Sequence, residues 1–393
     1  MPTYKELLSN TKKQIREIGT DELKRTLEAT AAPNKPALPA LIDVREADEL
    51  QAGVLPGAIP IPRGYLELRI EEKVPDKASP VVIYCAAGVR SAFAARTLEE
   101  LGYTDVASLR GGFNRWSDQG FPIEKRAQLS AEQKERYRRH LIIPEVGESG
   151  HQKLLDAKVL LLGAGGLGSP AALYLAAAGV GTIGIIDMDV VELSNLQRQV
   201  IHGQKSLGKP KTESAAERIR DLNADVKVIT FDERLTSANV ERVVSQFDLV
   251  IDGGDNFPTR YLLNDACVLL DKPNVHGSVF RFDGQVTTFV PRQGPCYRCL
   301  YPTPPPPEMA PSCAEAGVLG VIPGIIGMLQ ANEAIKLILG IGQPLVGRLL
   351  TFEGLATRFT ELKLRRDPKC PVCADGVPFP GFVDYEQFCS VAA

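Results

Sequence analysis

Two kinds of residue pattern in this chain of 393 residues can do chemistry, a glycine-rich turn and several clustered cysteines. Gly163, Gly165 and Gly168 form the pattern G-x-G-x-x-G directly after the apolar run Val159–Leu162 and before an alanine-rich segment, 169–178. A turn between a strand and a helix brings backbone N–H groups and a helix N-terminus against phosphates. Taken alone, the pattern would suit any dinucleotide enzyme.

Two C-x-x-C pairs, Cys296/Cys299 and Cys370/Cys373, lie far downstream of this turn. A nicotinamide enzyme has no need of them. Four thiolates from two such pairs form a closed, tetrahedral Zn²⁺ site with a structural role. The alternative is two unrelated reduced pairs; redox use is disfavoured because neither pair lies at a strand-to-helix turn. The spacing therefore predicts one structural zinc ion.

A third cysteine, Cys85, ends an apolar strand, 81–84, and opens the loop Cys85-Ala-Ala-Gly-Val-Arg90-Ser91. Backbone N–H groups and a helix N-terminus at such a turn stabilise an anionic sulfur and lower its pKa, and Arg90 adds a cation. The C-x4-R spacing is one residue shorter than the phosphatase spacing, and the smaller cradle suits a persulfide. The alternative is an inert cysteine buried at a strand end.

Charged side chains follow the strands that come after the glycine turn. Asp187 ends the second strand and is placed to bind ribose hydroxyls. Arg198 and Lys211 are suited to hold a departing pyrophosphate, and Asp255 could hold Mg²⁺. Any one of these residues could be a solvated surface charge. Because the carboxyl ends of parallel strands meet at one edge of a sheet, their common placement favours a binding site.

Composition limits the protein class. The apolar content of 44% and charged content of 24% are typical of soluble globular proteins, and the length predicts two domains. A net charge of −3 argues against nucleic acid as the main partner. The start of the chain lacks a secretory apolar segment, and polar residues interrupt the best membrane candidate, 318–339. Eight cysteines without a signal predict a reducing, cytoplasmic setting.

The expected fold class is α/β throughout, with a small parallel-sheet domain before a larger doubly wound, Rossmann-like domain. The expected divisions are a first domain, a linker, a second domain and a tail, at residues 1–125, 126–134, 135–374 and 375–393. The first domain should contain strands at 40–44, 80–84 and 106–109. The second should contain strands at 159–162, 182–187, 226–230 and 249–252, and a buried helix at 323–339.

Residues 20–125 resemble a single rhodanese domain. The resemblance rests on the Cys85 loop together with Leu41-Ile-Asp43-Val-Arg45, Leu55-Pro-Gly-Ala-Ile59 and Arg110-Gly-Gly-Phe-Asn-Arg-Trp116. It implies that Cys85 carries a transferable sulfane sulfur, loaded by a persulfide donor such as a cysteine desulfurase. Asp43 and Arg45 are structural residues in that family.

Residues 135–374 resemble the MoeB/ThiF family, relatives of the ubiquitin-activating enzymes. The resemblance implies ATP and Mg²⁺ binding by Gly163, Gly165, Gly166, Gly168, Asp187, Asn195, Arg198, Lys211, Asp255 and Asn256. It also implies that Arg139 enters the ATP site of a partner protomer, hence a homodimer. Cys313, in the segment 312–317, matches the crossover-loop cysteine that can be linked covalently to a carrier.

Together these resemblances predict a bifunctional adenylyltransferase and sulfurtransferase. It would adenylate the C-terminal Gly-Gly of a small ubiquitin-like sulfur carrier, and the persulfide of Cys85 would then form a thiocarboxylate for a molybdopterin, thiamin or related pathway. Cys313 is a candidate relay. The best-known fusions place the rhodanese domain after the adenylating domain, whereas here it comes first. Two alternatives are a nicotinamide or flavin oxidoreductase with a regulatory rhodanese domain, and a non-catalytic scaffold.

Overall fold

The computed structural model divides the chain into two compact units, Met1–Gln128 and Leu129–Ala393. The residues it describes are 3–29, 38–46, 48–124, 129–303, 317–379 and 381–382. The predicted linker, 126–134, includes the start of a helix, α6 (Ala131–Arg136), whose first turn is capped by the hydroxyl of Ser130. Each unit is described by itself.

The first unit is built on a five-stranded sheet in which all strands run parallel, in the order β1-β5-β4-β2-β3. Its strands are β1 (Arg16–Ile18), β2 (Ala40–Asp43), β3 (Ile59–Pro60), β4 (Val81–Tyr84) and β5 (Val106–Leu109). Its helices are α1 (Tyr4–Gln14), α2 (Thr20–Ala29), α3 (Leu66–Lys73), α4 (Arg90–Glu100) and α5 (Gly112–Asp118), with short 3-10 turns at Glu49–Ala52 and Arg63–Tyr65. The three predicted strands are present within a residue of the expected limits. β1 and β3 are too short to give a pattern.

Both faces of this first sheet are buried, as a parallel sheet requires. Along β4, Val81 and Ile83 pack with Cys85 on the face that α4 covers. Val82 and Tyr84 pack on the other face against Trp116 of α5. The strand therefore delivers Cys85 at its carboxyl end, between the two helical layers.

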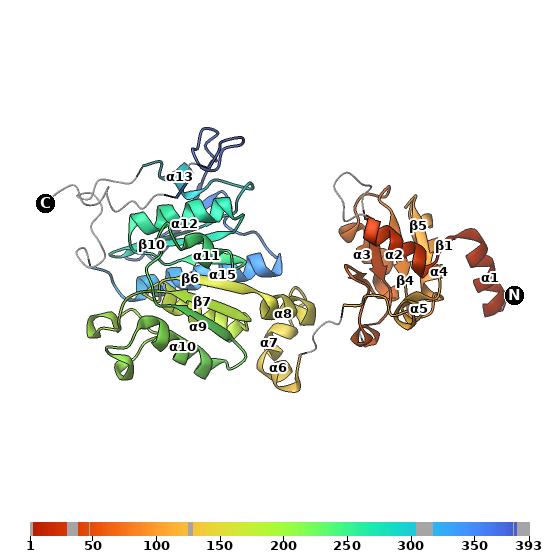
Figure 1. Ribbon diagram of the computed structural model, residues 1–393, viewed down its shortest axis with the longest axis horizontal. Coiled ribbons are helices and arrows are strands. Elements are labelled where there is room, and N and C mark those ends of the chain that lie inside the picture. Colours follow the sequence, from red (N-terminus) through yellow and green to blue (C-terminus); the bar gives the residue numbers. More distant parts are fainter. Residues whose placement is uncertain are drawn as a thin grey trace. The chain divides into compact units, whose positions relative to one another are not determined.

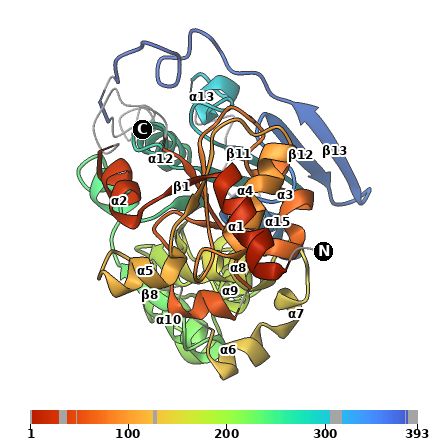
Figure 2. The ribbon, with the colours of Figure 1, turned by 90° about the vertical axis from the view of Figure 1, so that its right-hand side faces the viewer.

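The second unit contains an eight-stranded sheet in the order β13-β12-β11-β10-β9-β6-β7-β8. The run from β10 to β8 is parallel, and β11, β12 and β13 are antiparallel additions at one edge (Figure 2). The strands are β6 (Lys158–Leu162), β7 (Thr182–Ile186), β8 (Lys227–Phe231), β9 (Leu249–Asp252), β10 (Asn274–Phe280), β11 (Asp283–Phe289), β12 (Arg348–Glu353) and β13 (Arg358–Lys363).

Helices cover both faces of the parallel part (Figure 1). Val159 and Leu161 of β6 face α9 (Gly168–Ala178) and the core it shares with further helices, whereas Leu160 and Leu162 face the opposite core. The first layer also contains α8 (Gly147–Asp156), α10 (Lys211–Leu222) and α15 (Val321–Leu339); the second contains α11 (Val240–Val244) and α12 (Phe257–Leu269). The smaller helices are α7 (Arg138–Leu141) and α13 (Tyr297–Leu300), with 3-10 turns at Leu193–Asn195 and Gln204–Ser206.

The order of the five parallel strands is that of a doubly wound Rossmann-type sheet, as predicted. The chain moves outward from β6 to β7 and β8 and then returns to form β9 on the other side of β6. The switch point between β6 and β9 is where ligands bind in such sheets.

α15 is the helix predicted from 323 to 339, and it begins two residues earlier. Within the described residues it is the one helix long and apolar enough to cross a bilayer. Its residues Ile322, Ile326, Ala331 and Ala334 are nevertheless buried in the core that it shares with α9. Its apolar character is therefore explained by packing against the sheet.

Candidate active sites and metal centre

A cavity of about 310 Å³ lies at the switch point of the larger sheet. It is bounded by the turn after β6, by the residues that follow the carboxyl ends of β7 and β9, and by the first residues of α15. The predicted site residues that line it are Gly163, Gly165, Gly166, Asp187, Arg198, Lys211, Asp255 and Asn256. Most of the predicted nucleotide-binding residues therefore meet in one place.

The glycine turn is fixed from beneath by Asp187. The backbone N–H of Ala164 donates to Asp187 Oδ2 at 2.9 Å, and the N–H of Asp189 donates to Oδ1 at 2.9 Å. Burial raises the pKa of Asp187, although Lys211 and these two amides oppose the rise. Gly168 does not line the cavity; a Cβ there would overlap the carbonyl oxygen of Gly163, so this glycine allows α9 to start against the turn.

Two cations reach the cavity. Lys211 opens α10, and its Nζ donates to Asp189 Oδ2 at 2.7 Å; the lysine side chain is 7% exposed and the aspartate 62%. Arg198 follows a 3-10 turn and donates from Nη1 to the carbonyl of Ser194 at 3.0 Å. Both cations therefore line the same cavity as the glycine turn, where they can offset the charge of a polyphosphate.

The opposite wall is the loop after β9. The N–H of Gly254 donates to Asp252 Oδ1 at 3.0 Å, and Arg260 donates from Nε and Nη2 to the Gly254 carbonyl at 3.1 and 2.8 Å. Asn256 caps α12 by accepting from the N–H of Thr259, and its amide donates to Asp255 Oδ1 at 3.2 Å. Both the N–H and the carbonyl of Gly254 are therefore hydrogen-bonded. The next residue, Asp255, is exposed and lines the cavity.

Two further predicted residues, Asn195 and Arg139, do not line the cavity. Asn195 is buried and closes its own 3-10 turn by accepting from the N–H of Glu192. Arg139 is exposed on α7 and does not line the cavity of its own chain. Cys313 lies outside the described residues.

Sequence reasoning missed His202, which is buried beneath the glycine turn. Its Nε2 lies 3.0 Å from the carbonyl oxygen of Ala164, and Nδ1 lies 2.9 Å from Ser214 Oγ. Because a carbonyl only accepts, Nε2 carries the proton, and burial lowers the pKa of His202. A lone histidine gives no sequence signal. Sequence reasoning also missed Asp189, which lines the cavity and pairs with Lys211. Its place two residues after Asp187 is a signal that could have identified it.

The second site is the loop of Cys85. The N–H of Gly88 donates to Cys85 Sγ at 3.2 Å, and the buried hydroxyl of Ser91 lies 3.6 Å from it. Ser108 Oγ donates to Ser91 Oγ at 2.9 Å. Burial by itself would raise the pKa of Cys85, but the backbone and hydroxyl of Ser91 and the amides of Ala87 and Gly88 outweigh it and hold the pKa below its ordinary value.

The loop is oriented by α5. The N–H groups of Phe113 and Asn114 donate to the carbonyls of Cys85 and Ala86 at 2.8 and 3.0 Å. A Cβ on Gly112 would overlap the Cys85 carbonyl, so the close approach requires glycine. With its first carbonyls engaged by α5, the loop turns N–H groups toward the sulfur.

Arg90 and Arg45 are both ion-paired. Arg90 makes two hydrogen bonds of 2.6 Å to the carboxylate of Glu49, which lower the pKa of Glu49 to about 2. The cation predicted beside Cys85 is therefore present but tied to an acid that the sequence reasoning did not single out. Arg45 is buried against Asp43 at 2.6 Å, in agreement with a structural role.

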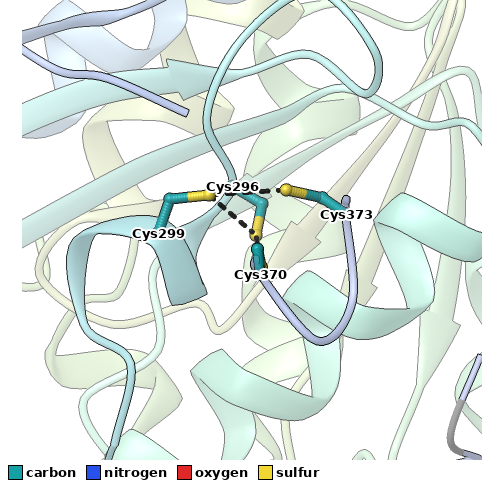
Figure 3. A group of neighbouring side chains, drawn as sticks. All are labelled: Cys296, Cys299, Cys370 and Cys373. Atoms are coloured by element: carbon teal, nitrogen blue, oxygen red, sulfur yellow. Dashed lines mark hydrogen bonds between the residues drawn. The ribbon is translucent and has the colours of Figure 1, made fainter. Parts of the chain in front are cut away.

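The four predicted metal-binding cysteines converge (Figure 3). Their Sγ atoms all lie within 4.8 Å of one another, with Cys296–Cys370 at 3.6 Å, Cys299–Cys373 at 3.4 Å and Cys296–Cys299 at 3.9 Å. Tetrahedral Zn–S bonds of about 2.3 Å would separate the sulfurs by about 3.8 Å. The N–H of Asp367 also donates to Cys299 Sγ at 3.4 Å. The cluster fits a closed four-thiolate metal site.

Comparison with known proteins assigns both parts of the chain. Residues 137–372 match the ThiF family, and residues 20–119 match the rhodanese-like domain. Both resemblances drawn from the sequence are confirmed.

The chain is 51% identical over 265 residues to a sulfur carrier protein adenylyltransferase of Thermus thermophilus, covering 66% of this chain and 98% of that one. It is 50% identical over 265 residues to the SAMP-activating enzyme E1 of Haloferax volcanii, covering 67% and 98%. It is also 50% identical over 275 residues to the probable adenylyltransferase/sulfurtransferase MoeZ of Mycobacterium tuberculosis, covering 69% of each. These names agree with the predicted pair of enzyme activities.

Among solved structures, E. coli MccB bound to a modified MccA peptide is similar with a TM-score of 0.55. The match covers 61% of this chain and 75% of that one at 23% identity. A second MccB structure, with ATP, gives a TM-score of 0.52. At this identity the likeness supports the fold.

Proposed function

The chain belongs to the ThiF family and carries a rhodanese-like domain ahead of its ThiF part; from this we propose an enzyme that adenylates a ubiquitin-like sulfur carrier with ATP and then transfers sulfur to it. The observation that carries the proposal is the cavity at the switch point, where a glycine turn faces Arg198, Lys211 and Asp255. Its counterpart is the separate Cys85 loop, whose N–H groups stabilise an anionic sulfur.

In the first reaction a terminal glycine carboxylate of the carrier attacks the α-phosphorus of ATP, and pyrophosphate leaves. The N–H groups of the glycine turn face the phosphates, and Arg198 and Lys211 stabilise the charge that develops on the pyrophosphate. The carboxylate of Asp187 accepts two amides and retains lone pairs for ribose hydroxyls. The chemistry is mainly positioning and charge stabilisation.

The metal assignments belong to this proposal. Mg²⁺ would neutralise phosphate oxygens, and Asp255 with Asn256 would hold it. The four cysteines would hold one structural Zn²⁺; elemental analysis of folded protein that finds no zinc would contradict this.

In the second reaction the terminal sulfur of a Cys85 persulfide bonds to the carbonyl carbon of the acyl-adenylate, and AMP leaves. A second thiol, for which Cys313 is the candidate, must then attack the Cys85 sulfur of the resulting acyl disulfide. The thiocarboxylate leaves, a Cys85–Cys313 disulfide forms, and an external thiol must reduce this disulfide before the next turnover. A persulfide donor such as a cysteine desulfurase would load Cys85. We place these reactions in the cytoplasm.

Arg139 supports a homodimer, because an exposed arginine outside its own cavity is free to enter the cavity of a partner. The dimer would therefore bring one Arg139 to each ATP site. Protein that sediments as a monomer and still has full pyrophosphate exchange activity would contradict this part of the proposal.

Carrier-dependent exchange of pyrophosphate into ATP tests the adenylation. We expect exchange with a small carrier ending in Gly-Gly and none when its last glycine is deleted. Asp255→Ala should lower exchange about a hundredfold, because the charge on pyrophosphate is then poorly neutralised. Glu241→Ala, on the exposed side of α11, is the control and should leave exchange unchanged. Hydride transfer to a nicotinamide without any exchange would favour the oxidoreductase alternative.

A further inference from the structure

The loop that presents Asp255 is supported by three buried side chains. His276 on β10 donates from Nδ1 to Asp252 Oδ2 at 2.7 Å, and Asp252 in turn accepts from the N–H of Gly254. Arg260 holds the carbonyl of the same residue. His276 and Asp252 are 0% and 1% exposed, and Arg260 is 8% exposed. The position of the loop is therefore determined by these three side chains.

Tyr297 packs against His276, one of these supporting side chains. It lies between Cys296 and Cys299 and is 1% exposed. Its ring is 5.1 Å from the ring of His276 at an angle of 62°. Nε2 of His276 is buried and has no hydrogen-bond partner among the described residues, so this imidazole is held by Asp252 and by ring packing.

Tyr297 is also fixed against α12. Its ring packs edge-to-face on the ring of Tyr261, with 5.1 Å between the ring centroids. The backbone is fixed as well, because the N–H of Tyr297 donates to Asn264 Oδ1 on α12 at 2.8 Å. The first cysteine pair and the Asp255 loop are therefore joined through one buried aromatic residue.

We propose that Tyr297 is a positioning residue for adenylation, which fixes the N–H of Gly254, and through it Asp255, by bracing His276 and its partner Asp252 against the Cys296–Cys299 turn. The proposal rests on the function proposed above for Asp255. It gives the first cysteine pair a role beyond holding the C-terminal segment. Val372, which lies between the cysteines of the second pair, packs with the cysteine cluster and Val268.

Amide hydrogen exchange of the full chain tests this without any ligand. In Tyr297→Leu, exchange at residues 253–256 should become about tenfold faster, because the His276 support loses the ring that packs against it. Tyr297→Phe keeps this ring, so exchange should stay within about twofold of the wild-type rate. The matched control is Val372→Ala, which loosens the other cysteine pair and should leave this loop unchanged. Zinc content and thermal unfolding of all three proteins establish that each is folded.

A double-mutant cycle in the pyrophosphate exchange assay provides the second readout. Tyr297→Leu should lower carrier-dependent exchange about tenfold in the wild-type background and have little further effect in Asp255→Ala, because coupled residues are not additive. An equal loss in both backgrounds would overturn the proposal.

The two possible failures are distinguishable. If the wild-type chain shows no carrier-dependent exchange, the proposed function fails while the hydrogen-exchange result still stands. If exchange activity is present and residues 253–256 are as protected in Tyr297→Leu as in Tyr297→Phe and Val372→Ala, the positioning role is wrong.

Discussion

The two anion-binding loops of this molecule differ in how much of each site comes from one stretch of chain. Around Cys85, the sulfur is contacted by Gly88 and Ser91 of its own loop, and one helix, α5, orients that loop. The cavity at the switch point collects residues from the turns after several parallel strands and from the helices α10, α12 and α15. The first site is local, and the second exists only when the whole sheet has formed.

The cations in the two sites also differ. Arg90 and its partner Glu49 are both about one-third exposed, at 34% and 29%. Lys211 is 7% exposed while its partner Asp189 is 62% exposed. Solvent screens the first pair more strongly than the second. We therefore expect the buried lysine to matter more to its site than the paired arginine matters to Cys85.

The largest effect should separate the two sites completely. Cys85→Ala removes the sulfur nucleophile from its own compact unit, so thiocarboxylate formation from a persulfide donor should stop while pyrophosphate exchange continues. Mass spectrometry of the carrier decides this, because replacing the terminal oxygen by sulfur adds about 16 Da. Excess free sulfide should bypass the defect by attacking the acyl-adenylate directly.

Cys267→Ala is the matched control for this experiment. Cys267 is buried on α12, and burial raises the pKa of its thiol, so it is not a nucleophile. Both reactions should survive this substitution. If Cys85→Ala still yields the mass shift at the normal rate, another cysteine carries the sulfur, and Cys313 becomes the first candidate.

The same contrast explains what the sequence could predict. The Cys85 loop, the glycine turn and the two C-x-x-C pairs are short patterns whose geometry follows from neighbouring residues, and the structure contains all of them. Asp187, Lys211 and Asp255 could be assigned to one cavity because parallel strands align their carboxyl ends. The fold class followed from the alternation of strands and helices.

Residues that act from beneath these sites could not be predicted. His202 contacts the carbonyl of Ala164, which lies 38 positions away, and His276 contacts the carboxylate of Asp252, which lies 24 positions away. Glu49 was missed because its partner Arg90 lies 41 positions away. Only the register of strands and the packing of helices bring such pairs together, and neither is encoded in a local spacing.

A smaller loss should result when the buried cation of the ATP site is removed. Lys211→Ala should lower pyrophosphate exchange about a hundredfold, because charge on the leaving pyrophosphate loses a desolvated partner. The neighbouring Lys209→Ala is the control, since Lys209 pairs with Glu217 on the surface. Lys211→Ala with more than half of the wild-type rate would show that the lysine serves only to pair with Asp189.

The smallest effect concerns the acid that restrains Arg90. Glu49→Gln removes a carboxylate whose pKa is about 2 and which is therefore ionised at every pH at which Cys85 titrates. Without this carboxylate the Arg90 charge acts on the sulfur unopposed. The already lowered pKa of Cys85 should therefore fall by about a further half unit to one unit. The rate of alkylation by iodoacetamide, followed against pH, measures this shift, and the wild-type midpoint should lie below the ordinary cysteine value of about 8.5.

The control for this shift is Glu46→Gln, an exposed acid in the same turn that does not pair with Arg90. Its alkylation midpoint should match that of the wild type. A midpoint that rises in Glu49→Gln would mean that Glu49 acts by holding Arg90 near the sulfur, and that a freed Arg90 turns toward solvent. In that case the ion pair would be part of the sulfur site, and the two cations would be alike in needing an acid to place them. A midpoint that falls would preserve the difference between the two sites. The loop amides would then stabilise the thiolate without help from the ion pair, and Arg90 would only lower the pKa of Cys85 further.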